Sequence, residues 1–441
     1  MSSSLIFRHA LLPTGWAEHV RLVFENGVIT GVIPGQSGGQ GIALPGMPNL
    51  HSHVFQRAFA GLTERRGPGA DSFWTWRELM YRFANALTPD DLEAVALHGY
   101  IEMLERGFTH VAEFHYLHNA PDGTPYANPA EMSARLAAAA AQAGIGLLLL
   151  PVFYAHGGFG GQPPGPAQRR FLTSLDRYAE IVAACEALAP TGLAPHSLRA
   201  VTPDELAHLA ALAGARPVHI HIAEQTAEVE ACLAWCGQRP VEHLLATAPA
   251  GPNWCLVHAT HVTPAELTAM AERGVVAGLC PITEANLGDG IFPAANFTGG
   301  FGIGSDSNVL IDPFAELQLL EYSQRLGVRA RNVMASPSFP ATATALWARA
   351  SAGGAQALGI GPGLTPGAPA SFVVLPSAQP PDIALSQAVF APRTGMIEQV
   401  WSGGVQQVAG GAHRLASKAR ARFEAVVDKL MLRNEQASQA L

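Results

Sequence analysis

The chain has 441 residues, of which 48% are hydrophobic and 14% are charged, and its formal net charge is −8. This balance excludes a disordered chain, and the lack of a long basic run argues against a nucleic-acid partner. The length predicts one large domain with a smaller one beside it.

The ends and the cysteines predict a cytoplasmic protein with no membrane partner. The first residues lack the basic region and continuous apolar segment of a signal peptide. The longest apolar stretch, 145–155, is too short to cross a bilayer. Five cysteines, an odd number scattered along a long chain, favour reduced thiols.

Residues 1–45 contain short strand-like pieces, at 22–24 and 28–33, separated by glycine turns. Residues 366–415 resemble them, with strand-like runs and Gly-Gly pairs. We expect these two segments to pair into one small β-sandwich domain that flanks the main body. Residues 416–441 follow an amphipathic pattern that predicts a C-terminal helix packed on that body.

Residues 46–365 alternate between strand-like and helix-like segments. Eight strand candidates end at 51–53 or cover 107–114, 145–153, 192–197, 217–223, 254–258, 275–281 and 300–305. The helices between them begin with Thr-Pro-acid sequences at 88–91, 202–205 and 263–266. Eight consecutive βα units predict an α/β fold of the (β/α)8 TIM-barrel type. An open doubly wound sheet is less favoured, because no glycine-rich phosphate loop follows the first strand.

Polar residues gather at the carboxyl ends of these strands, which form the active-site mouth of a (β/α)8 barrel. His51 and His53 are two apart on a strand, so they point to the same face. Together with a third histidine and Asp306 on other strands, they predict a site for a divalent transition metal, with zinc as the expected ion. The full set of strand-end or strand residues is His51, His53, Glu113, His115, His196, His219, His221, His258 and Asp306.

His219 and His221 compete for the third ligand position on the fifth strand. The spacing His221-x-x-Glu224 favours His221, because it places an acid just beyond the strand, within reach of a ligand held by the metal. His219 points the same way but deeper into the barrel, where we expect a structural role.

These motifs resemble those of the metal-dependent amidohydrolase superfamily. The motifs are His51-x-His53, His221-x-x-Glu224, His258 in VHATH and Asp306 in GSDSN. The resemblance implies a (β/α)8 barrel with a flanking β-sandwich. Binuclear members bridge their metals with a carboxylated lysine, but Lys418 and Lys429 are the only lysines and both lie beyond the barrel. We therefore expect one zinc ion per subunit.

Within the superfamily, the chain is similar to the N-formimino-L-glutamate deiminase family. The resemblance lies in MPNLHSHVFQRAFAGL, DSFWTWRELMY, PHSLRAV, HIAEQTAEVE and LCPITEANLGDGIF. It implies that Gln56, Tyr116, His196 and Arg199 contact the substrate. It also implies that Arg77 reaches the site from a loop, either of the same chain or of the partner in a homodimer.

The expected chemistry is hydrolytic loss of ammonia from a carbon that carries nitrogen. Zinc lowers the pKa of bound water to about 7. Asp306 can take the proton of that water, Glu224 can protonate the departing nitrogen, and His258 can stabilise the negative charge. A substrate with two carboxylates is expected to be bound by arginines, whose guanidinium groups hold a carboxylate through two hydrogen bonds, and Arg77 and Arg199 are the candidates. N-formimino-L-glutamate is such a small dicarboxylate, and its products would be N-formyl-L-glutamate and ammonia, a step of histidine degradation.

Three other functions stay open at this point. A deaminase of guanine or a related heterocycle could use the same metal site. The metal residues alone do not exclude an N-formylglutamate hydrolase. A non-catalytic scaffold that has lost its metal is disfavoured, because all six metal and catalytic positions are present.

Overall fold

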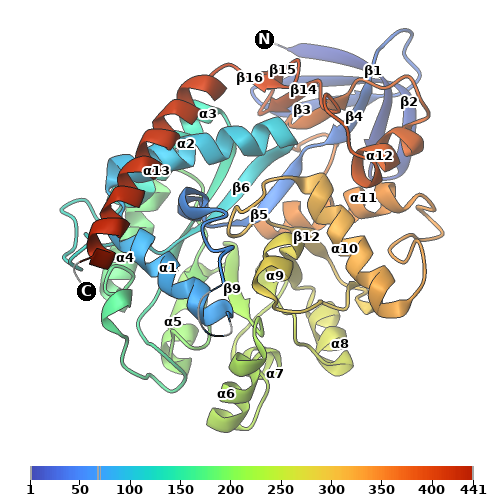
Figure 1. Ribbon diagram of the computed structural model, residues 1–441. Coiled ribbons are helices and arrows are strands. Elements are labelled where there is room, and N and C mark those ends of the chain that lie inside the picture. The colour runs from blue at the N-terminus through green and yellow to red at the C-terminus, as the bar shows by residue number, and fades with distance from the viewer. Residues whose placement is uncertain (1, 67–68, 70, 440–441) are drawn as a thin grey trace.

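Eight parallel strands form the centre of the molecule in the computed structural model, which describes residues 2–66, 69 and 71–439 (Figure 1). They are arranged as two four-stranded sheets, with the strand orders β5-β6-β7-β8 and β12-β11-β10-β9. Their bounds are β5 (Met47–Ser52), β6 (Phe108–His115), β7 (Gly146–Phe153), β8 (Ala194–Pro195), β9 (Val218–Ile222), β10 (Trp254–His258), β11 (Val276–Leu279) and β12 (Phe301–Ile303).

The two sheets meet at both edges, so the strands close into the predicted (β/α)8 barrel. Parallel bridges Leu193↔Val218 and Ser197↔His221 join the β8 side to β9. At the other edge, the backbone N–H of Asp306 donates to the carbonyl of His51 at 3.0 Å, and the N–H of His53 donates to the carbonyl of Asp306 at 2.9 Å. Barrel closure thus brings the last strand's carboxylate beside the first strand's histidines.

Helices surround the barrel (Figure 1). They are α1 (Phe73–Ala86), α2 (Pro89–Arg106), α3 (Glu131–Ala143), α4 (Leu175–Glu186), α5 (Pro203–Ala213), α6 (Thr226–Cys236), α7 (Pro240–Thr247), α8 (Pro264–Arg273), α9 (Pro281–Leu287), α10 (Pro313–Val328) and α11 (Thr342–Leu358). As predicted, Thr88, Thr202 and Thr263 cap α2, α5 and α8, each accepting a hydrogen bond from a backbone N–H of the first turn. Short 3-10 segments lie at η1 (Val54–Phe59), η2 (Pro166–Gln168) and η3 (Ala294–Asn296).

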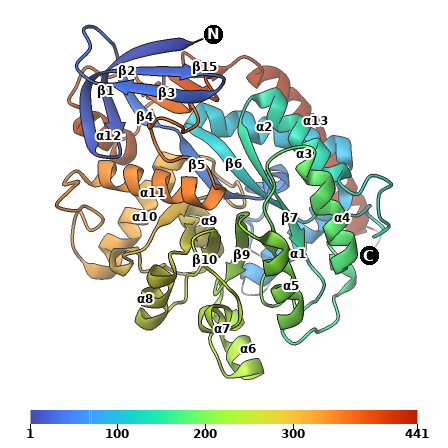
Figure 2. The ribbon, with the colours of Figure 1, turned by 180° about the vertical axis from the view of Figure 1, so that it is seen from behind.

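Both ends of the chain join in an eight-stranded sheet beside the barrel (Figure 2). Its strand order is β16-β15-β14-β13-β4-β1-β2-β3, with β1 (Ser3–Leu12), β2 (Gly15–Glu25), β3 (Val28–Ile33), β4 (Ile42–Pro45), β13 (Phe372–Leu375), β14 (Gln399–Ser402), β15 (Val405–Ala409) and β16 (Ala412–His413). The two halves meet where β4 pairs antiparallel with β13. Phe7, Phe24 and Phe372 pack edge to face in a hydrophobic core of this sheet. The division into separate domains at 45/46, 365/366 and 415/416 stays a prediction.

Two helices accompany the C-terminal strands. The segment 366–415 contains α12 (Pro381–Phe390), which the strand-only interpretation missed and which packs on α10 and α11. The expected C-terminal helix is present as α13 (Ala416–Gln439), and residues 440–441 lie outside the described residues. It packs on α2, where the Nζ of Lys429 lies 2.6 and 2.7 Å from the two carboxylate oxygens of Asp91.

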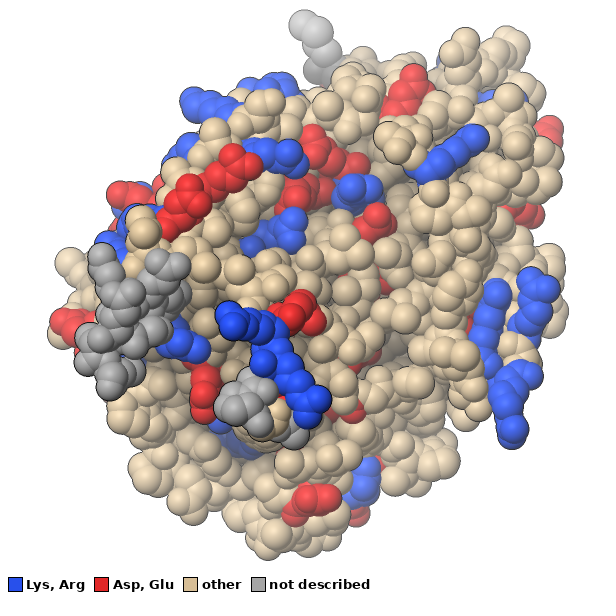
Figure 3. Space-filling view, in the orientation of Figure 1, with Lys and Arg blue, Asp and Glu red and all other residues tan. Residues whose placement is uncertain are grey.

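The surface in Figure 3 carries charged side chains of both signs, interspersed over the face shown. Over the described residues that this view shows, neither sign forms one extended field. Within the described part of the chain, no helix is both long enough and apolar enough to cross a bilayer.

Candidate active site

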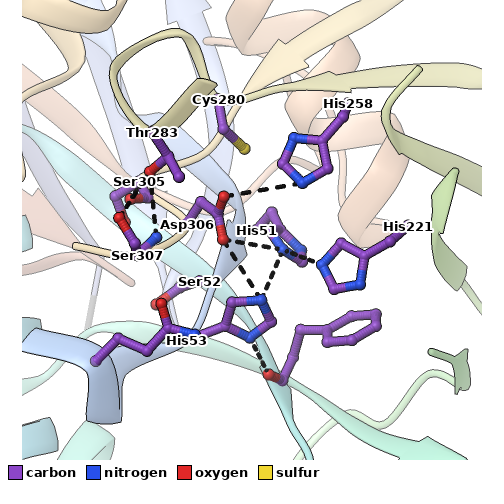
Figure 4. Close-up of polar contacts among 12 residues, drawn as sticks. His51, Ser52, His53, His221, His258, Cys280, Thr283, Ser305, Asp306 and Ser307 are labelled. Atoms are coloured by element: carbon purple, nitrogen blue, oxygen red, sulfur yellow. Dashed lines mark hydrogen bonds and ion pairs between the residues drawn. The ribbon is translucent and has the colours of Figure 1, made fainter. Parts of the chain in front are cut away.

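Three imidazoles and one carboxylate converge at the carboxyl end of the barrel strands (Figure 4). The Nε2 of His51 lies 3.2 Å from the Nε2 of His53 and 3.0 Å from the Nε2 of His221. One carboxylate oxygen of Asp306 lies 3.5 Å from the Nε2 of His51 and 3.4 Å from that of His53. The four predicted ligands therefore surround one small volume.

The hydrogen bonds of the outer ring nitrogens show that this group fits a cation. The Nδ1 of His53 lies 2.7 Å from the carbonyl of Phe114, and the Nδ1 of His221 lies 3.1 Å from the carbonyl of His196. A carbonyl can only accept, so both Nδ1 atoms carry the proton and both Nε2 atoms turn a lone pair toward the centre. Burial lowers the pKa of both histidines, and it lowers the pKa of His51 to about 3, so the rings are neutral. Converging lone pairs with an anionic oxygen are the donor set of a divalent metal site.

The loop that carries Asp306 is held against the first strand by buried polar contacts. The amide of Asn49 donates to the hydroxyl of Ser305 at 2.7 Å and accepts the backbone N–H of Ser305 at 3.0 Å. A Cβ atom at Gly304 would lie 2.7 Å from the carbonyl oxygen of His51, so only glycine allows this close approach. Asp306 itself has a positive φ of 45°, the kind of backbone strain that gathers at functional sites.

Glu224 and His258, two residues that can carry a proton, lie next to the ligand group. The Nε2 of His258 lies 3.8 Å from carboxylate oxygens of both Glu224 and Asp306, and its Nδ1 lies 3.2 Å from an oxygen of Glu284. Burial raises the pKa of Glu224 to about 7, so this carboxyl can hold a proton near neutral pH. Burial alone would lower the pKa of His258, but the carboxylates of Glu224, Glu284 and Asp306 raise it to about 10.

A pocket opens beside these residues, and all five predicted substrate contacts line it. They are Gln56, Arg77, Tyr116, His196 and Arg199. The side-chain amide of Gln56 donates to the hydroxyl of Tyr116 at 3.0 Å, and its own oxygen is buried without a hydrogen-bond partner. Arg77 reaches the pocket from helix α1 of the same chain, so the expectation that it lies in a loop was wrong. Arg199 follows β8. The pocket is thus lined by three members of the ligand group (His53, His221 and Asp306), by Glu224 and His258, and by two guanidinium groups. The fourth member, His51, is fully buried behind them.

Glu113, His115 and His219, which the sequence also singles out, lie outside both this pocket and the ligand group. Glu113 accepts the backbone N–H of Val54 at 2.7 Å, and the Nε2 of His115 bonds to the hydroxyl of Ser133 at 2.9 Å. The buried Nε2 of His219 donates to the carbonyl of Ala357 at 2.9 Å, and the structural role expected for this residue stays a prediction.

Two residues near the pocket, Glu284 and Glu228, were missed by the sequence interpretation. Glu284 bonds to His258 and also accepts the backbone N–H of Cys280 at 2.9 Å. Glu228 accepts the backbone N–H of Glu224 at 3.1 Å, and its other oxygen lies 4.0 Å from the Nε of Arg199. The only signal for them was their presence in the stretches HIAEQTAEVE and LCPITEANLGDGIF.

The barrel with histidines and an aspartate at its strand ends defines the architecture of a metal-dependent hydrolase. Residues 42–406 match the amidohydrolase family, and the chain belongs to that family. It is 48% identical to the formimidoylglutamate deiminase of Pseudomonas aeruginosa, over 97% of this chain and 100% of that protein. It is also 28% identical to a 5-methylthioadenosine/S-adenosylhomocysteine deaminase of Natronomonas pharaonis, over 82% of this chain and 80% of that protein.

Solved structures agree with this fold. The crystal structure of an amidohydrolase from Brucella melitensis is 52% identical, with a TM-score of 0.94 over 97% of this chain and 99% of that one. An adenosine deaminase from Xanthomonas campestris with bound zinc is 22% identical, with a TM-score of 0.80 over 97% of this chain and 98% of that one, and it supports the fold alone.

Proposed function

We propose that this chain hydrolyses N-formimino-L-glutamate to N-formyl-L-glutamate and ammonia, using one zinc ion held by His51, His53, His221 and Asp306. The observation that carries the proposal is one pocket lined by three of these ligands (His53, His221 and Asp306), by Glu224 and by the guanidinium groups of Arg77 and Arg199. His51 lies directly behind it, 3.0 Å from the Nε2 of His221. The similarity to the Pseudomonas aeruginosa enzyme supports the same substrate. The homodimer and the cytoplasmic location stay predictions.

The two arginines account for substrate recognition. N-formimino-L-glutamate carries two carboxylates, and a planar guanidinium binds a carboxylate through two parallel hydrogen bonds. Gln56 and Tyr116 offer a buried amide oxygen and a hydroxyl beside the ligand group, where the formimino nitrogens would lie. A flat neutral base would offer neither guanidinium group a carboxylate to bind.

The acid–base residues account for the reaction. A bound zinc ion supplies a water molecule of lowered pKa. Asp306 turns one carboxylate oxygen toward His258 and can accept the proton of that water. The oxygen of this water would add to the formimino carbon, and its two protons, taken up by Asp306, would reach the terminal nitrogen in turn through Glu224. The C–N bond would then break as a C=O bond forms, and ammonia would leave. The imidazolium of His258 stabilises the negative charge that develops on oxygen.

Arg199→Ala is expected to lower kcat/KM for N-formimino-L-glutamate. The loss should correspond to roughly 1.5–3 kcal/mol of binding free energy, the value of a hydrogen bond to a charged group. The loss should fall mainly on KM, because Arg199 touches a part of the substrate that does not react. Steady-state kinetics measure it, with Arg331→Ala, which removes an exposed arginine, as the control. A wild-type KM in Arg199→Ala would rule out the carboxylate role.

Glu284→Gln is expected to lower kcat by roughly 10- to 100-fold, the usual effect of removing a carboxylate that orients a functional histidine. Glutamine can still accept the N–H of Cys280, but it removes the charge that holds the Nδ1 proton of His258. Metal content and KM should stay unchanged. Glu316→Gln is the matched control, since Glu316 is a buried carboxyl that accepts the N–H of Ile282. Equal kcat values in the two variants would show that Glu284 does not act through His258.

A further inference from the structure

A buried thiol lies beside the carboxylate of the ligand group. Cys280 follows β11, its side chain is fully buried, and the proposed function gives it no role. Its Sγ, a ring nitrogen of His258 and a carboxylate oxygen of Asp306 all lie within 4.8 Å of one another. Figure 4 shows the thiol and the His258 ring on the side of Asp306 that faces away from His53. Thiolate, imidazole and carboxylate are the three ligand types of zinc sites.

The two oxygens of Asp306 face different partners. One oxygen lies 3.4–3.5 Å from the Nε2 atoms of His51 and His53, and the other lies 3.8 Å from the Nε2 of His258. A carboxylate placed in this way can bridge two metal ions, as in two-metal hydrolases.

His258 is oriented as metal-binding histidines are. Its Nδ1 faces the carboxylate of Glu284 at 3.2 Å, so the Nε2 is the atom that turns toward the thiol and Asp306. Histidines that bind metals usually donate the opposite ring N–H to a carboxylate in this manner. An oxygen of Glu224, 3.8 Å from the same Nε2, offers a fourth donor.

We propose that His258, Cys280 and Asp306 form a second, weaker site for a thiophilic divalent cation such as Zn²⁺ or Cd²⁺, and that its filling inhibits the enzyme. The cation binds His258 and Asp306 and lies beside Glu224, so none of these three groups can then transfer a proton or stabilise charge in the reaction. The site fills after the first one, because the ion must displace the protons of the thiol and of His258 and is repelled by its neighbour.

Titration of the one-metal enzyme with Cd²⁺ tests this proposal. Equilibrium dialysis should show a second bound equivalent, and the thiolate-to-cadmium charge-transfer absorption should grow with it. Ammonia release should fall over the same range of Cd²⁺ concentration. Mg²⁺ should give neither binding nor inhibition in this range, because a thiolate site selects soft ions. Binding and absorption are read without the substrate, so they test the site even if the proposed reaction is wrong.

Variants of Cys280 identify the ligand. Cys280→Ala and the near-isosteric Cys280→Ser should each lose the charge-transfer band, keep the first metal ion and raise the Cd²⁺ concentration for half-inhibition by at least about tenfold, since even partners outside the ligand set change metal affinity 10- to 100-fold. Cys255→Ala is the matched control. Cys255 lies on β10 and is, like Cys280, a fully buried free thiol, but it belongs to none of the groups among the described residues that could hold a metal ion. A band or an inhibition curve that is unchanged in both Cys280 variants would overturn the proposal.

Discussion

Glu224→Gln is expected to keep the metal ion and the substrate affinity but to lower kcat by at least about 100-fold, the usual contribution of a positioned proton donor. The carboxyl is buried, and burial raises its pKa to about 7, so it can hold the proton that the departing nitrogen needs. Glutamine has the same shape but cannot transfer a proton. Steady-state kinetics and elemental analysis of the same preparation measure both effects.

Glu113→Gln provides the control for that experiment. Glu113 is also a buried carboxyl at the end of a barrel strand, and burial raises its pKa to about 8. Its oxygen accepts the N–H of Val54, a bond that glutamine can also accept, and it lies outside the pocket. Glu113→Gln should therefore keep kcat close to that of the unmodified protein. If Glu224→Gln were equally active, Glu224 would not be the proton donor.

His221→Asn is expected to release the metal ion and abolish ammonia formation, whereas His219→Asn should keep one metal ion per chain. Both histidines lie on β9, both are buried, and they are two residues apart. Only the Nε2 of His221 faces the ligand group, at 3.0 Å from the Nε2 of His51. Loss of one of four ligands should weaken metal binding by more than the 10- to 100-fold that a partner outside the ligand set contributes.

Metal content after dialysis against a metal buffer distinguishes these two variants. Thermal unfolding of both variants should be compared, because His219 stabilises the barrel through its bond to Ala357. A stable His221→Asn variant with a full metal complement would show that the ligand group is wrong. If only His219→Asn lost the metal ion, His219 would be the ligand and His221 would not.

The barrel could be predicted because its strands are continuous apolar runs and its helices start at strong capping sequences. β9, β10 and the caps at Thr88, Thr202 and Thr263 lie where the sequence predicts them. β8 was the weakest candidate, and it has only two residues, Ala194–Pro195. Isolated bridges rather than a long ladder join this segment to its neighbours, and such bridges require no continuous apolar run in the sequence. The missed α12 did carry a start signal, because proline and Asp382 occupy its first turn.

The ligand group could be predicted because a barrel brings the carboxyl ends of all its strands to one mouth. The direction of each side chain was harder to predict. On β6 the ring of Phe114 points inward, with its centroid 4.5 Å from that of His221, so the alternation of the strand turns Glu113 and His115 away. The role of Glu284 depends on how the first turn of α9 approaches β10, and residue spacing does not contain that information.

Ammonia release from the zinc-loaded enzyme, measured with N-formimino-L-glutamate and with guanine in parallel, tests the central proposal most directly. We predict equal amounts of ammonia and N-formyl-L-glutamate from the first compound, loss of both after the metal is removed by a chelator, recovery on addition of zinc, and no ammonia from guanine. Ammonia from guanine but not from N-formimino-L-glutamate, or the same rate of release after the metal has been removed, would contradict it.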